Sequence, residues 1–444
     1  MDRITFEDGL YREHLEEASF LYQKRICDLE DPEASSTGSK EVEDRFEAHL
    51  DGLLVGGDRA LEAGRKACRK GDAGELHAFA RVVCRLRRRD LLDEILEWVT
   101  SESGEKVQAV ADALKHELPQ EWQDYLRSLL KKEDEQLQEI VATVIGYRRI
   151  PAGRELVQAL WRGISPPLIW AAGRLREQSA ITVLQRGLAH GDDAISSAAA
   201  LALLRMGDRQ ALHYCEEVAA KKGWGALFLA LGGGLSSVPV LREIARSAQA
   251  SPDAVLALGL LGEISAVPVL LELLSSSQLA VSAASALNLL TGADLYHGVF
   301  LPDPFREDEL FPDELEAYRR HGTIPTRADG TRYGAWAVHP SPDAESWNRW
   351  WGCNERRFRS GIRFRSGVPC SLSLILHSLR RDKIPSRYRQ LAHEELVIRY
   401  DNDFPFEADR FVSDQTRVID EAAASVVRQA GAGEWFFAGR RIDF

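Results

Sequence analysis

Five consecutive segments between residues 139 and 292 repeat one layout, and this repeat restricts the possible folds more than any other feature of the chain. Each segment is an apolar helix, a turn, a small residue and a second apolar helix. A helical hairpin that is apolar on two faces can bury both only by stacking against a neighbour on each side. The small residues that open the second helices follow one another at spacings of 28, 31, 26 and 29: Ala152, Ala180, Ala211, Ser237 and Ala266.

Helical periodicity continues on both sides of these repeats. Apolar residues recur at helical spacing over 1–30, and a second helix begins near Glu41 and is interrupted or ended by Gly52, Gly56 and Gly57. Further helices are expected at 58–70, 75–88, 90–100, 105–116, 119–132, 371–381, 385–399 and 409–429. The repeat length and its Ala, Leu and Gly content predict an all-α fold, a HEAT-like α-solenoid with flanking N- and C-terminal helical regions.

The same patterns divide the chain into four parts. We expect an N-terminal helical region over 1–138, the HEAT-like repeats over 139–292 and a C-terminal helical module with an Arg-rich block over 341–444. The acidic, Pro-containing segment 293–340 breaks the helical pattern, which predicts either a long ordered loop over the solenoid or a partly flexible linker. Residues 358–369 alternate and contain glycines, which indicates a short strand pair or an extended turn.

Composition and charge exclude several classes of protein. The 444 residues carry 56 Lys and Arg against 68 Asp and Glu, a net charge of −12, which argues against a nucleic-acid partner. No apolar run of about 18 residues is present, so no membrane insertion is expected. The charged start lacks an apolar signal core, and the six cysteines form no CxxC pair. These features predict a cytoplasmic protein with reduced thiols.

One block has the opposite charge from the rest of the chain. Residues 354–390 contain nine Arg and one Lys against two acids, a net charge of +8, with interleaved aromatics. Such a block could bind an acidic protein partner, a phosphate or single-stranded nucleic acid, or its arginines could pair internally with the acidic linker and with Glu394, Glu395 and Asp401. The candidate partner-binding residues are Arg356, Arg357, Arg359, Arg363, Arg365, Arg387 and Arg389.

Other candidate sites have simpler interpretations. His14, Glu17, His49 and Asp51 could face one another from two helices as a metal or acid/base site, but structural ties between the helices are the favoured interpretation. Three glycines at 232–234 follow a helix and lack the Lys-Ser/Thr of a phosphate loop, so they indicate a turn.

The basic run 81–90 is interpreted as a solvated helix face, and Trp347, Trp350 and Trp351 share one helix face that is expected in the core. No GxSxG or HExxH motif occurs. No catalytic residue, metal or cofactor is therefore predicted.

Several blocks are similar to a known family. EHLEEASFLYQKR and DRFEAHLDGLLVGG near the start, and LNLLTGADL, SWNRWW, RFRSGIRFRSGVP and RYRQLAHEEL toward the end, resemble a poorly characterised bacterial HEAT-repeat family. Members of that family are often encoded beside type VI secretion gene clusters. The resemblance implies a cytoplasmic protein connected with that machine, and it supplies no catalytic residues.

Two functions from different classes follow. Because solenoids expose a long curved surface, the first is a non-enzymatic protein-binding scaffold. The resemblance makes it a type VI secretion-associated effector adaptor or chaperone, or an immunity protein, whose protein partner is a secreted effector or toxin. The alternative is a HEAT-like lyase-type enzyme that binds a tetrapyrrole or another small ligand.

Overall fold

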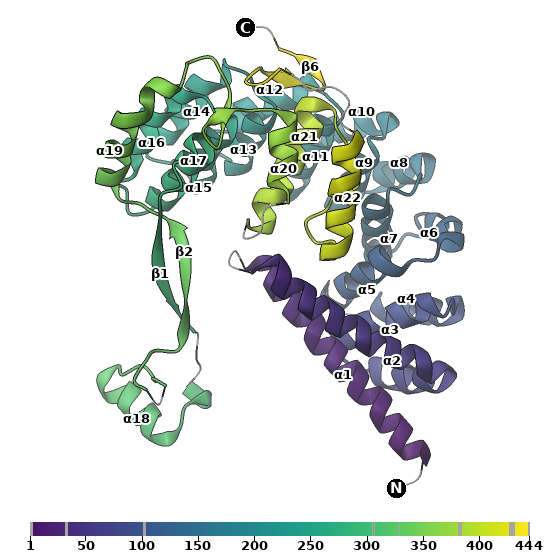
Figure 1. Cartoon of the computed structure of the whole chain (residues 1–444). Coiled ribbons are helices and arrows are strands. Elements are labelled where there is room, and N and C mark those ends of the chain that lie inside the picture. The colour runs from purple at the N-terminus through teal and green to yellow at the C-terminus, as the bar shows by residue number, and fades with distance from the viewer. Residues whose placement is uncertain are drawn as a thin grey trace.

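The computed structural model describes residues 3–31, 34–100, 104–303, 305, 307–327, 329–380, 384–425 and 431–442. Within these ranges the chain forms twenty-two α-helices and three short two-stranded antiparallel sheets. The helices stack one after another into a curved, solenoid-like array (Figure 1). The predicted all-α fold class is confirmed.

The array opens with two long helices, α1 (Arg3–Glu30) and α2 (Ser36–Cys68), which pack against each other. The hydroxyl of Ser35 accepts a hydrogen bond from the amide of Gly38 and caps α2. At Gly57 the backbone leaves helical geometry, with φ 52° and ψ −131°, so α2 consists of two helical segments that meet at a kink. The helix expected over 58–70 is therefore the second half of α2.

The solenoid that follows has an inner and an outer layer of helices. Each inner helix contacts the next inner helix along the chain. The inner helices are α3 (Ala73–Arg85), α5 (Gly104–Glu117), α7 (Glu135–Arg148), α9 (Pro166–Leu175), α11 (Asp193–Arg205), α13 (Gly223–Gly232), α15 (Pro252–Leu261) and α17 (Ala280–Thr291). The outer helices are α4 (Arg89–Val99), α6 (Gln123–Leu129), α8 (Gly153–Arg162), α10 (Ile181–Leu188), α12 (Arg209–Val218), α14 (Ser237–Arg246) and α16 (Val267–Leu273). The stacking begins well before residue 139, since α1 already packs against α3, so the hairpins extend further toward the N-terminus than the sequence repeat shows.

Small residues allow the hairpins to pack closely. The five small residues that mark the repeat are all buried and lie within two residues of the start of an outer helix. Inner helices also approach one another through glycines. A Cβ on Gly173 would lie 2.8 Å from the Cα of Ala202, and one on Gly259 would lie 2.6 Å from the Cα of Ala286. Larger side chains at these positions would force the hairpins apart.

Residues 293–340 differ from both expected forms, the loop over the solenoid and the flexible linker. Strands β1 (Tyr296–Pro302) and β2 (Gly334–Pro340) pair antiparallel along their whole length. Between them lies α18 (Pro312–His321). We call the two strands the ribbon, residues 303–333 the tip, and the two together the arm. Figure 1 shows the arm projecting away from the solenoid.

The C-terminal module, residues 341–442, begins with α19 (Ala344–Asn354), in which Trp347 is buried. Its α20 (Leu372–Ser378), α21 (Ser386–Tyr400) and α22 (Val412–Ser425) lie on the inner side of the curved stack (Figure 1). Strands β3 (Phe364–Arg365) and β4 (Val368–Pro369) confirm the short strand pair, and β5 (Phe436–Phe437) and β6 (Arg440–Arg441) form another. Residues 426–429 of the last expected helix lie outside the described residues.

One further expectation concerns membranes. Among the helices of the described ranges, none combines the length and the apolar character needed to cross a bilayer.

Candidate partner-binding surfaces

The Arg-rich block separates into buried and exposed arginines. Arg363 and Arg365 are 0% and 5% exposed, and both bind the buried carboxylate of Glu395. Arg363 also donates from Nε to the carbonyl of Leu261 and from Nη2 to that of Leu260, each at 3.0 Å. These two arginines therefore hold the module against α15, and their assignment to a partner-binding surface is wrong in this structure. The internal pairing with Glu395 is confirmed.

Two further candidates have partners within the chain. Arg387 is exposed and lies 2.6 Å from Asp253. Arg389 is half-buried, donates to the carbonyl of Leu379 at 3.1 Å and stacks over Phe406.

The remaining three candidates are exposed and lie close together in the chain, at and just after a short 3-10 turn, Glu355–Arg357. They form the part of the predicted surface that a partner could reach: Arg356, Arg357 and Arg359.

The C-terminal module lies on the concave face of the solenoid and is bound there by ion pairs with the inner helices. We call these ion pairs the ionic seam. Basic side chains at the carboxyl ends of successive inner helices face acids from α21 and the chain that follows it. The pairs of the ionic seam are Lys115–Asp409 at 2.6 Å, Arg149–Asp403 at 3.3 Å, Arg174–Glu394 at 2.7 Å, Arg174–Glu407 at 2.6 Å, Arg176–Asp401 at 2.5 Å, Arg205–Glu394 at 2.6 Å and Arg205–Asp403 at 2.9 Å.

Glu394 occupies the centre of the ionic seam. Burial alone would raise the pKa of this carboxyl, but the facing guanidinium groups of Arg174 and Arg205 outweigh burial and hold the pKa well below its ordinary value. At Glu407 burial dominates, and the pKa lies above its ordinary value despite Arg174. Glu394 is therefore a permanent anion at neutral pH, matched to two buried cations.

The polarity of the contact reverses beyond α11. Inner helices α13 and α15 end in apolar residues and glycines, so they present backbone carbonyls instead of basic side chains. Arg399 of α21 donates to the carbonyl of Ala230 at 2.7 Å, and Arg363 reaches the end of α15 in the same way. One end of the module thus presents acids to basic side chains of the solenoid, and the other end presents arginines to backbone carbonyls. This difference fixes the position of the module along the concave face.

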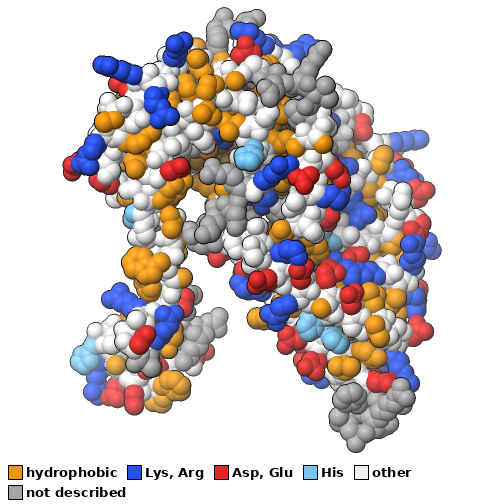
Figure 2. Space-filling model, in the orientation of Figure 1, with side chains coloured by type: hydrophobic (Ala, Val, Ile, Leu, Met, Phe, Trp, Pro, Cys, Tyr) orange, Lys and Arg blue, Asp and Glu red, His pale blue; other side chains and the backbone are white. Residues whose placement is uncertain are grey.

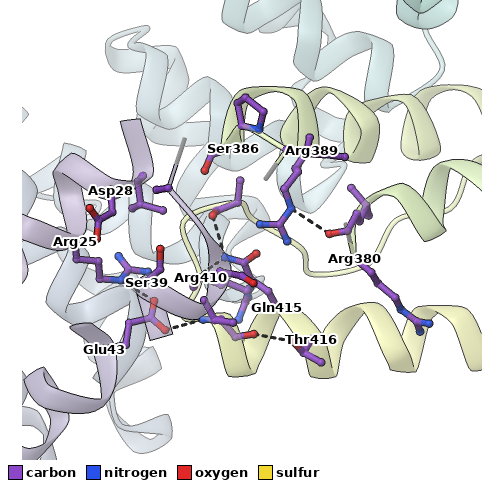
Figure 3. Close-up of a pocket in the computed structure, with 18 of the residues that line it drawn as sticks. Arg25, Asp28, Ser39, Glu43, Arg380, Ser386, Arg389, Arg410, Gln415 and Thr416 are labelled. Atoms are coloured by element: carbon purple, nitrogen blue, oxygen red, sulfur yellow. Dashed lines mark hydrogen bonds and ion pairs between the residues drawn. The ribbon is translucent and has the colours of Figure 1, made fainter. Parts of the chain in front are cut away.

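A third set of contacts joins the N-terminal helices to the module around a cavity of about 200 Å³ (Figure 3). Glu43 of α2 accepts from Arg25 at 3.0 Å and from the backbone amide of Val412 at 2.8 Å, where it caps α22. Arg410, also at this cavity, stacks over Tyr147. Among the charged groups around the cavity, Arg25 and Glu43 bind the N-terminal helices to the module, since Arg25 also donates to the carbonyl of Asp409 at 2.5 Å.

The basic run 81–90 is only partly solvated. Arg81 is buried and Arg85 half-buried, and both bind Glu47 and Glu117. Arg81 also stacks against Phe411 of the module at 4.8 Å. The interpretation as a solvated helix face is therefore wrong for these two residues, because the module and α2 cover this part of α3.

The histidine pair of the N-terminal helices is brought together, with Nδ1 of His14 3.1 Å from Nδ1 of His49. Asp51 is exposed and lies 3.8 Å from Arg85. Within the described part of the chain, no group of three or more potential metal ligands assembles here or elsewhere. The two rings serve as a contact between α1 and α2, and the close approach of Gly52 to the His14 ring agrees with that.

The arm is the candidate surface that the sequence did not reveal. Trp336 and Val338 on one face of the ribbon are 75% and 62% exposed, and Tyr296 beside them is also exposed. Figure 2 shows hydrophobic side chains gathered on the ribbon between the body and the tip. The fourteen residues of the two strands include no Asp, Glu, Lys or Arg, although 28% of the chain is charged. Exposed apolar patches of this kind mark interaction sites.

Comparison with known proteins does not assign the chain to a family. No protein-family model and no curated protein matches the chain. Among solved structures, an engineered protein from the Northeast Structural Genomics Consortium is similar to 65% of this chain and 88% of its own, at 15% sequence identity and a TM-score of 0.31.

Proposed function

We propose that this chain is a non-catalytic protein-binding scaffold that binds its partner through the ribbon of the arm. The concave face, which a solenoid usually offers to a partner, is occupied by the C-terminal module of the same chain. Buried pairs such as Arg205–Glu394 hold the module there. A partner of the folded chain therefore binds elsewhere.

The exposed ribbon is the single observation that carries this proposal. An isolated two-stranded ribbon is at best marginally stable in water. Here it also exposes Trp336 and Val338, whose burial against a partner would remove apolar surface from water and so favour the complex. A partner that covers this face would bury apolar surface and stabilise the ribbon at the same time.

The class of partner rests on the resemblance to the type VI secretion-associated family. It makes a secreted effector or toxin the expected partner, with the chain acting as an adaptor, a chaperone or an immunity protein. The lyase-type alternative, which would bind a tetrapyrrole or another small ligand, is not favoured by the geometry. The module fills the concave face where a solenoid enzyme would hold such a ligand.

Affinity purification from the native host, followed by mass spectrometry, tests the proposal. The wild-type chain is compared with Trp336→Ser/Val338→Ser, with Arg356→Glu/Arg357→Glu/Arg359→Glu, and with Val281→Ser as a control for loss of an exposed apolar side chain on α17. We expect one secreted protein to be lost with the ribbon variant alone. Loss with the arginine variant alone would assign the interface to the exposed arginines and contradict the proposal.

A further inference from the structure

The alternation of hydrogen-bonded and non-bonded residue pairs along the ribbon shows which backbone groups point outward. The amide of Asp303 donates to the carbonyl of Tyr333 at 3.2 Å, and that of Ser341 donates to Leu295 at 3.0 Å. These two bonds lie just beyond the two ends of the ribbon, and the residues that they join continue its register. Because bonded and non-bonded pairs alternate in an antiparallel ladder, Gly298–Val338 and Phe300–Trp336 are non-bonded pairs. Their backbone amides and carbonyls point away from the partner strand.

The outer edge of β2 is therefore an open strand edge. Within the described residues each strand of the ribbon has one neighbour only. The Trp336 ring leans across the ribbon over β1: its Cε3 would lie 3.4 Å from a Cβ on Gly298, and it meets the Phe300 ring edge-on at 5.7 Å. This orientation leaves the outer edge of β2 clear and places an apolar face beside it. Pro340 lacks an amide at one end of the β2 edge, which limits the open edge to the residues before it.

We infer that β2 binds an extended segment of the partner protein as a third strand. The inference rests on the proposed function and specifies how the ribbon would carry it. Such a segment gains backbone hydrogen bonds to Trp336 and Val338, and every second side chain extends the apolar face. A third strand also converts a marginal ribbon into a stable sheet.

Charge defines the chemistry of that segment. The ribbon is uncharged, so the part of the segment that pairs with β2 is uncharged too, with apolar residues at alternate positions. The tip carries eight acids against five bases. A segment that continues toward the tip is therefore complementary in charge to the acidic tip if it carries Lys or Arg at that end.

A phage-displayed library of random 12-residue peptides, selected on the full chain, tests the inference. We expect the enriched peptides to show alternating apolar residues with Lys or Arg at one end. Enrichment of peptides without this alternation, or failure to enrich any, would overturn the inference. Concentration-dependent dimerisation of the chain that Val338→Pro abolishes would also overturn it, because the occupant would then be a second copy.

Proline variants show whether binding uses the backbone of β2. Val338→Pro removes an outward amide while the neighbouring pairs keep the ladder of the ribbon, since proline is tolerated at such edge positions. We expect it to weaken the binding of a synthetic enriched peptide about tenfold. Val338→Thr keeps the amide, and Gly298→Pro alters the opposite edge at the paired position. Both controls should stay within about threefold of wild type.

Equal affinities for Val338→Pro and Val338→Thr would contradict strand addition at β2. If the host partner is lost from Trp336→Ser/Val338→Ser but retained by Val338→Pro, the proposed function stands and strand addition is wrong. If Trp336→Ser/Val338→Ser retains the host partner, the proposed function itself is wrong.

Discussion

Glu394 of α21 accepts a hydrogen bond from Arg205 of α11 at 2.6 Å, although the two residues are 189 positions apart in the sequence. Its other carboxylate oxygen lies 2.7 Å from Arg174 of α9. One buried carboxylate thus joins two successive hairpins of the solenoid to the module that fills them. The stacking of the hairpins and the docking of the module are therefore energetically linked at this residue.

Removing that charge should destabilise the whole chain. In Glu394→Gln two buried guanidinium groups each lose one of two charged partners, since Arg174 keeps Glu407 and Arg205 keeps Asp403. The free energy of unfolding should fall by up to about 3–5 kcal/mol. Urea unfolding followed by circular dichroism measures the change. Glu345→Gln breaks an exposed pair with Arg349 and should change stability by less than about 1 kcal/mol. Equal effects of the two substitutions would show that the ionic seam does not hold the module.

Acid should weaken the chain through the same carboxylates. The pKa of Glu394 and the pKa of Glu395 are held below their ordinary values by facing arginines, so the folded state binds fewer protons than the unfolded state. Their stabilisation is complete above the unfolded pKa of about 4.3 and is lost as the pH falls further. Urea midpoints at pH 5 and pH 3 should therefore differ more for wild type than for Glu394→Gln. Parallel losses in the two proteins would contradict this assignment.

Buried histidines should add a loss of stability at a higher pH. Burial holds the pKa of His77 and the pKa of His393 well below 6.5, so the unfolded chain takes up these protons first as the pH falls. Stability should begin to decline below about pH 6.5. In a His393→Gln variant the decline between pH 7 and pH 5.5 should be shallower than in wild type. An unchanged slope would mean that His393 is protonated in the folded state.

The register of the inner helices has its own test. Leu258 lies buried in α15 beside Gly259, which contacts the next inner helix. Leu258→Asp places an unpaired carboxylate there and should lower the melting temperature sharply or prevent folding, since the change is comparable to the total stability. Val281→Asp on the exposed side of α17 should change stability by about 0.5 kcal/mol or less. A normal melting temperature for Leu258→Asp would show that this register is wrong.

The sequence predicted the solenoid where its signal is local. The small residue after each turn, as at Ala211, repeats at nearly constant spacing because every hairpin needs close packing at that point. The earlier hairpin of α3 and α4 lacks this mark, since its turn contains Arg87 and Arg88. Its helices were expected, but their place in the stack was not.

The ribbon could not be predicted in the same way. Its strands are separated by the 31 residues of the tip, 303–333, whereas sequence signals for a strand pair depend on a short turn between them. The pairing of Tyr296 with Pro340 is a tertiary contact, and the proline and acid content of the tip concealed it.

The ionic seam was partly visible in the sequence. Lys115, Arg149, Arg174 and Arg205 lie near the ends of four successive inner helices, at spacings close to the repeat length. Glu395 pairs with arginines of the block, as one interpretation expected. Glu394 and Asp401 instead bind arginines of the solenoid, and only the folded position of the module determines that choice.

Site-specific photo-crosslinking tests the central claim most directly. A photoreactive amino acid is placed separately at Trp336 in the ribbon, at Arg356 in the exposed arginine group and at Trp161 on outer helix α8. After irradiation in the native host, the account predicts one dominant adduct with a secreted protein from position 336 and none from position 161. An adduct from position 356 or 161, with none from position 336, would contradict it.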